Sequence, residues 1–163
     1  MAHAKFVKAA AKDYPEHGIK KGESYYWWKF RFGGKHYSKT PPKRSQLTQS
    51  DFLSQIYEIE DDIAIFECNN PEDLRSALDD FASRISGLGE ECSDRLSNMP
   101  ESLQQGSTGE LLQNRADECE LWASEVEAID VPDFENTESP TDDEKAELES
   151  ALEQLKSTSY GGD

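Results

Sequence analysis

The sequence predicts an α+β protein in which a small N-terminal antiparallel β-sheet is followed by an acidic α-helical bundle or antiparallel coiled coil. Three observations support this class. Residues 24–40 form an aromatic run, a glycine pair and a second short run; apolar residues then recur at helical spacing; and the two parts carry charges of opposite sign. The predicted domains are a basic aromatic β module at 1–47, acidic helices at 48–130, and an acidic linker, C-terminal amphipathic helix and loose tail at 131–163.

Residues 24–40 predict a β-hairpin. With Gly33 and Gly34 as a two-residue turn, Phe32 pairs with Lys35 and Lys29 pairs with Ser38. Alternation along the strands then gives a core face and a cationic face. The core face would hold Tyr26, Trp28, Phe30, Phe32 and Tyr37. The cationic face would hold Tyr25, Trp27, Lys29, Arg31, His36, Ser38 and Thr40.

A two-stranded hairpin is not stable alone, so a further strand is expected from residues 5–8 (KFVK), with a helix packed on the aromatic face. The segment after the hairpin contains Pro41 and Pro42, which cannot continue a central strand. This segment is therefore expected to form a basic hinge.

The cationic face predicts contact with nucleic acid. Lys and Arg neutralise phosphates, and aromatic rings stack on bases or pack against sugars. The alternative is a strand face that carries cations only for solubility and edge protection. The candidate nucleic-acid-binding residues are Tyr25, Trp27, Lys29, Arg31, Lys35, His36, Lys39, Lys43 and Arg44.

The stretch KGESYYWWKFRFGGKHYSKTPP, residues 21–42, resembles an N-terminal segment of small proteins encoded by bacteriophages and related mobile elements. More loosely, residues 24–40 resemble the arm-type DNA-binding domains of tyrosine recombinases. In those domains a three-stranded sheet enters the major groove. The resemblance implies DNA contact by Lys29, Arg31, Lys35, His36 and Lys39, without recombinase catalysis, because no catalytic domain follows.

Four helices are predicted after the β module, at about residues 51–67, 71–98 and 107–128, with a last one after Thr141. Each start carries a capping signal. These signals are Thr48 with Asp51, Asn70 before Pro71, Ser107 with Glu110, and Thr141 with Glu144.

The second of these helices has a seam of nearly heptad spacing, which predicts one long helix to about Asn98; the alternative is a kink or interruption at Gly87 and Gly89. The seam residues are Leu74, Leu78, Phe81, Ile85, Leu88, Cys92, Leu96 and Met99. Two interpretations fit this spacing. The seam forms the core within one chain, or it forms a homodimer with a second copy.

The charge is strongly asymmetric. The 163 residues carry 17 Lys and Arg against 34 Asp and Glu, a net charge of −17. Residues 1–48 hold 11 of the basic and 3 of the acidic residues, so their net charge is +8 and that of the remainder is −25. Surfaces of opposite sign indicate partners of opposite chemistry, unless the two halves neutralise each other within one molecule or between protomers.

Carboxylates are densest near the C-terminal end. A solvated helix surface is the simplest interpretation. The alternative is a row of negative charges that imitates a nucleic acid and occupies the basic channel of another protein. The candidate acidic partner-binding residues are Asp130, Asp133, Glu135, Glu138, Asp142, Asp143, Glu144 and Glu147.

The sequence argues against catalysis, cofactors and export. Cys68, Cys92 and Cys119 share no CxxC spacing, every histidine lies in the basic segment, and no phosphate-cradling motif is present. No apolar run approaches the roughly 18 residues that cross a bilayer, and no signal peptide is recognisable. A cytoplasmic, non-enzymatic protein without a metal, cofactor or membrane partner is expected.

These expectations combine into one leading hypothesis and two alternatives. In the first, a phage-like protein contacts nucleic acid through its β module, and its acidic helices bind a partner or dimerise. The first alternative is an acidic nucleic-acid mimic that inhibits a basic host protein of defence or DNA processing. The second is a structural adaptor in a viral assembly.

Overall fold

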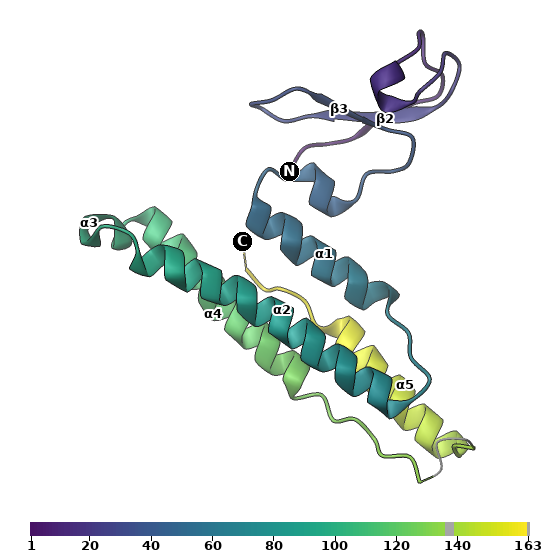
Figure 1. Cartoon of the computed structure of the whole chain (residues 1–163), viewed down its shortest axis with the longest axis vertical. Coiled ribbons are helices and arrows are strands. Elements are labelled where there is room, and N and C mark those ends of the chain that lie inside the picture. The colour runs from purple at the N-terminus through teal and green to yellow at the C-terminus, as the bar shows by residue number, and fades with distance from the viewer. Residues whose placement is uncertain (136–138, 163) are drawn as a thin grey trace. The chain divides into compact units, whose positions relative to one another are not determined.

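A computed structural model describes residues 1–135 and 139–162. A small three-stranded antiparallel sheet is followed by helices, so the predicted α+β class is confirmed (Figure 1). The chain divides into two compact units, Met1–Glu58 and Ile59–Asp163. Helix α1 (Asp51–Ile65) begins in the first unit and ends in the second.

The sheet of the N-terminal unit has the strand order β1, β2, β3. Strand β1 (Lys5–Val7) pairs with β2 (Tyr25–Lys29), and β2 pairs with β3 (Lys35–Ser38), both antiparallel. The third strand predicted at residues 5–8 is therefore confirmed. Its register places Lys5 directly opposite Trp27 on the middle strand.

The predicted hairpin register is wrong. Lys29 pairs with Lys35 instead of Ser38, so the connection is a five-residue loop, 30–34, and not a Gly33-Gly34 turn. An odd shift of register exchanges the two faces of a strand. Tyr37 therefore lies opposite Trp27, and His36 lies opposite Trp28.

Aromatic packing on both faces of the sheet explains this register. Trp28 is buried and its ring stacks on His36 with centroids 5.5 Å apart. Tyr25 is buried on the opposite face, where the centres of the Tyr25 and Tyr37 rings are 6.0 Å apart. Neither face is purely a core face, in contrast to the prediction.

The long β1–β2 connection folds over part of the Tyr25 face. It contains a 3₁₀ turn, η1 (Pro15–His17), and its backbone is closed by a bridge between Tyr14 and Ile19. Ala10 and Ile19 are buried against Tyr25 in a small cluster, and Tyr14 packs on it. The partly buried side chains of Val7, Trp27 and Tyr37 also pack against this cluster.

The chain after β3 forms η2 (Arg44–Leu47) and then α1. The Ser54 hydroxyl donates to the carbonyl of buried Ser45 at 3.2 Å, which ties η2 to α1. Ser50 caps α1, because its Oγ accepts from the Leu53 amide. The predicted cap, Thr48, instead accepts from the Ser50 amide, which lies before the helix.

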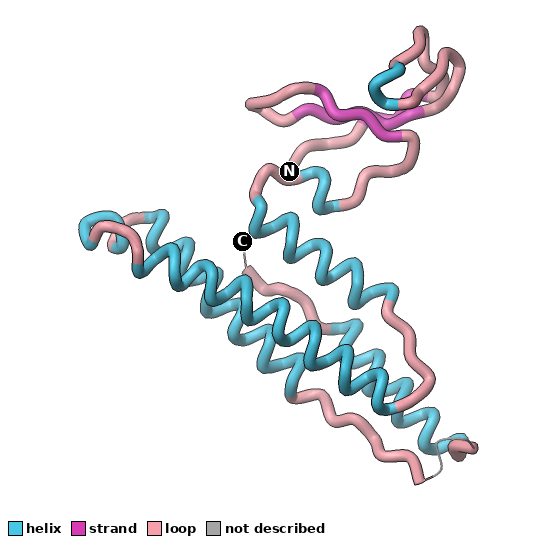
Figure 2. The backbone as a smooth tube through the Cα atoms, viewed as in Figure 1, coloured by secondary structure: helices cyan, strands magenta, loops and turns pink. Residues whose placement is uncertain are grey.

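The C-terminal unit contains α2 (Pro71–Ser97), α3 (Glu101–Gln104), α4 (Ser107–Glu127) and α5 (Asp142–Ser157). Helices α2 and α4 lie side by side along their lengths, and α5 contacts α2 (Figure 2). Helix α2 is continuous through both of its glycines. The seam residues Leu74, Leu78, Phe81, Ile85, Leu88 and Cys92 are buried within the chain.

Two of the four predicted capping signals are confirmed, and those at Thr48 and Ser107 are wrong. Asn70 caps α2 by accepting from the Asp73 amide at 2.7 Å, and Thr141 caps α5. Gly106 occupies the cap position of α4 without a side-chain bond, so Ser107 is the first helical residue and makes no capping box. None of the described helices combines the length and the apolar character that a bilayer-crossing segment requires.

Candidate nucleic-acid interface

The Tyr25 face of the sheet carries a compact cationic patch around the half-buried Trp27. Lys5 lies opposite Trp27 on β1, and Lys35 lies opposite Lys29 across β2 and β3. Alternate residues of a strand project from the same face, so the lysine side chains surround one indole. We call Lys5, Trp27, Lys29 and Lys35 the Trp27 patch.

Two of the ammonium groups contact the indole directly. The Lys35 Nζ lies 4.8 Å from the centre of the Trp27 ring, and the Lys5 Nζ lies 5.3 Å from it. Both distances are within the range of cation–π attraction. The half-buried Trp27 ring thereby holds two flexible lysines close to the sheet surface.

The cations of the patch are available for a partner. Lys5, Lys29 and Lys35 are exposed. Among residues 1–135 and 139–162, no ion pair joins any of these three to a carboxylate. Three unneutralised ammonium groups beside an aromatic ring make a surface that favours a polyanion.

Two predicted binding residues have structural roles that the sequence did not indicate. Tyr25 is buried in the cluster with Ala10 and Ile19, so it is not on a solvent-facing surface. A hydrogen bond with Tyr14, together with burial, raises the pKa of the Tyr25 hydroxyl. His36 is exposed but lies on the opposite face from Trp27, stacked on Trp28.

The predicted basic residues beyond the hairpin lie outside the patch. Lys39 pairs with Glu23 at 2.9 Å, and Glu23 also accepts from the Lys20 amide. That amide and the Lys39 ammonium lower the pKa of the Glu23 carboxyl. Arg44 stacks over Tyr57 at 4.1 Å, whereas the Lys43 side chain is exposed.

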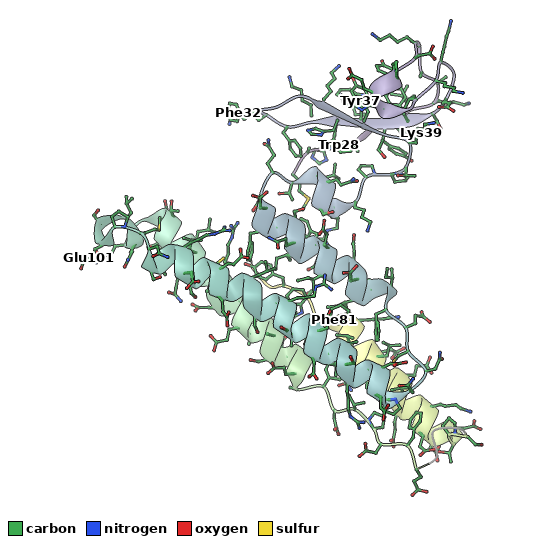
Figure 3. The ribbon with its side chains drawn as sticks, viewed as in Figure 1. Trp28, Phe32, Tyr37, Lys39, Phe81 and Glu101 are labelled. Carbon is green, nitrogen blue, oxygen red and sulfur yellow. The ribbon has the colours of Figure 1, made fainter. Side chains whose placement is uncertain are left out.

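The β2–β3 loop presents a cation and an aromatic ring together. Arg31 is exposed, and its guanidinium lies 5.4 Å from the centre of the Phe32 ring. Phe32 is 76% exposed at the end of the loop, although the predicted face assignment placed it in a core (Figure 3). The loop begins directly after Lys29, so it continues the Trp27 patch along the chain.

The structure places the predicted acidic residues in several environments. Asp133 pairs with Arg75, and Asp142 lies 3.6 Å from the Lys145 Nζ. The Glu144 carboxylate accepts from the amides of Thr141 and Glu135, so it serves as a cap. Asp130, Glu135, Asp143 and Glu147 are exposed, and Glu138 lies outside the described residues.

A second acidic surface, which the sequence did not single out, lies between α2 and α4. It is an open groove of about 480 Å³. Its acidic lining residues are Glu90, Asp94, Asp117 and Glu120. In residues 1–135 and 139–162, no cluster of three or more His, Cys, Asp or Glu side chains could hold a metal ion.

Sequence reasoning missed Lys5 and Phe32 as members of the basic surface. Lys5 could not be placed beside Trp27 without the β1–β2 register, although a strand at residues 5–8 was expected. Phe32 was assigned to a core by assuming a two-residue turn. In the structure Phe32 lies in a five-residue loop, so the alternation of side chains along a strand does not apply to it.

Comparisons with protein-family models, curated proteins and solved structures found no match to this chain. The candidate interface therefore rests on its own geometry and chemistry.

Proposed function

We propose that this protein is a non-enzymatic nucleic-acid-binding protein whose N-terminal unit contacts the phosphate backbone through the Trp27 patch. The observation that carries the proposal is the arrangement of three exposed lysines around one half-buried indole, none of them paired with a carboxylate of residues 1–135 or 139–162. The lysines neutralise phosphates, and the edge of the indole packs against sugar or base.

Charge balance supports a polyanionic partner. Residues 1–58 carry 11 Lys and Arg against 5 Asp and Glu. Two of these five carboxylates are engaged within the unit, because Glu23 pairs with Lys39 and Asp13 accepts from the Lys21 amide. The unit keeps a net charge of +6, which favours a polyanionic partner.

The acidic helices are a less well supported binding surface. Of the predicted acids, Asp133 and Glu144 already have partners that hold the linker and the start of α5. An inhibitor that imitates nucleic acid needs rows of carboxylates free for a basic partner. This candidate function and the role of a viral structural adaptor remain alternatives to the proposal.

The test compares two triple variants with the same loss of charge. Lys5→Gln/Lys29→Gln/Lys35→Gln removes the patch, and Lys8→Gln/Lys20→Gln/Lys21→Gln removes three exposed lysines elsewhere in the unit. Affinity for a labelled oligonucleotide is measured over a range of salt concentrations. Each lost phosphate contact lowers the slope of log affinity against log salt by about 0.7 to 0.9.

The patch variant is expected to bind weakly, and the magnitude of its slope of log affinity against log salt should be smaller by about 2 to 3. The control variant should stay close to the unmodified protein. Equal weakening in both variants would mean that net charge, and not the patch, drives binding. Recovery of one basic protein from a nuclease-treated bacterial lysate, with no oligonucleotide binding, would favour the inhibitor alternative.

A further inference from the structure

The β2–β3 loop exposes one aromatic ring to solvent, and a hydrogen bond fixes the loop backbone at that residue. Phe32 is 76% exposed. The Gln49 side-chain amide donates to the Phe32 carbonyl at 2.8 Å, which fixes the loop backbone from outside the sheet. Gly33 follows with φ of 149°, a conformation that residues with side chains rarely adopt.

The surroundings of this ring are cationic. Arg31 lies over the Phe32 ring, and Lys29 and Lys35 are the strand residues on either side of the loop. Lys29 and Arg31 also line a hollow of about 260 Å³. The other residues that line it are Met1, Ala2, Phe30, Leu47, Thr48 and Gln49.

We infer that Phe32 is a base-stacking residue, and that the protein prefers nucleic acid whose bases are unpaired or easily unstacked. This inference rests on the proposed function and adds the class of nucleic acid. An exposed ring held at a loop tip stacks on any base, because every base has a π face. The adjacent cations hold the phosphates on either side of that base, and the hollow gives a displaced base or phosphate space beside Arg31.

The same tip is less suited to a lipid surface. Membrane-binding segments bury a broad apolar face, whereas Phe30, the other aromatic of the loop, is already half-buried and only Phe32 is largely exposed. A single ring flanked by Arg31, Lys29 and Lys35 matches a stacked base between phosphates better than an acyl layer.

The test measures binding of the full chain to a single-stranded oligonucleotide, to the same sequence as a duplex, and to vesicles containing phosphatidylserine. The single strand carries 2-aminopurine, whose fluorescence reports stacking. The variants are Phe32→Ala, Phe32→Trp and Phe32→Leu, and Phe6→Ala is the matched control because Phe6 is also exposed, at 58%, but lies in β1.

Phe32→Ala is expected to lose about 5- to 150-fold in affinity for the single strand, the range for one stacked base, and much less for the duplex. Phe32→Trp should restore binding and the 2-aminopurine signal, whereas Phe32→Leu should not. The salt dependence should not change in any of these variants, because no phosphate contact is removed. Phe6→Ala should bind as the unmodified protein does.

Three results would overturn the inference. If Phe32→Ala binds the single strand unchanged while the unmodified protein binds with a steep salt dependence, the inference fails and the proposed function stands. If the unmodified protein binds neither form of nucleic acid, the proposed function fails and the inference fails with it. If Phe32→Ala loses only vesicle binding, the ring serves a membrane contact instead.

Discussion

Lys29 and Lys35 lie directly opposite each other across strands β2 and β3. Both side chains are exposed on the face that carries Trp27, so two like charges are adjacent. Like charges directly opposite in a sheet destabilise it. A fold selected only for stability gains nothing from this pair, whereas a surface that binds phosphates does.

Lys29→Glu should therefore change stability and binding in opposite directions. It replaces repulsion with a Glu–Lys pair, and at low salt the free energy of unfolding of the N-terminal unit should rise by a few tenths of a kcal/mol. Affinity for an oligonucleotide should fall. Urea unfolding and fluorescence anisotropy measure the two effects. Lys29→Gln should give a smaller stabilisation, and a destabilised Lys29→Glu would contradict the pairing.

The two glycines of α2 should respond oppositely to alanine. A Cβ at Gly87 meets nothing within 4 Å, so Gly87→Ala should stabilise the helix by up to about 1 kcal/mol. A Cβ at Gly89 would lie 3.0 Å from the Cys119 Cβ and 3.3 Å from the Ala116 carbonyl. Gly89→Ala should therefore be less stable than Gly87→Ala by about 1–3 kcal/mol, an overpacking effect. Thermal unfolding of the two variants measures this difference. Equal stabilisation by both alanines would contradict the close approach of α2 to α4 at Gly89.

The helices could be predicted from sequence because their signals are local. Asn70 and Thr141 cap the helices that were expected to follow them, and the apolar spacing of α2 matches its buried seam. Local signals fail where two neighbouring residues are both able to cap. Ser50 takes the position expected for Thr48, since its hydroxyl reaches the Leu53 amide.

The sheet register could not be predicted from the hairpin alone. It depends on Tyr37 meeting Tyr14, which belongs to the distant β1–β2 connection, and on Gln49 holding the Phe32 carbonyl. Neither contact leaves a periodic signal within residues 24–40. Because an odd shift exchanges faces, this single error placed His36 on the candidate surface and Phe32 in the core.

The cysteines of the C-terminal unit should differ in reactivity. Cys119 is fully buried, and burial raises the pKa of its thiol to about 12. Cys68 is half-buried, and burial also raises its pKa, so it should react more slowly than a free thiol. Iodoacetamide followed by peptide mass spectrometry should find Cys68 modified first, with Cys92 and Cys119 protected until the unit unfolds. Modification of Cys119 as fast as Cys68 under native conditions would contradict its burial.

The start of α5 should lose stability in acid because of Glu144. The Thr141 amide, then the Glu135 amide, lower the pKa of its carboxyl below the ordinary value of 4.5. A carboxyl whose pKa is lower in the folded state stabilises the fold above its unfolded pKa, and that contribution disappears as the pH falls through the folded pKa. Glu144→Gln should therefore be less stable than the unmodified protein at neutral pH, and the difference should shrink well below pH 4.5.

Urea unfolding at neutral pH and well below pH 4.5 measures this difference. Glu147→Gln, an exposed change on the same helix, should show no such pH-dependent difference. An equal difference in free energy of unfolding at both pH values would contradict this prediction. It would mean that the negative charge of Glu144 does not stabilise the start of α5.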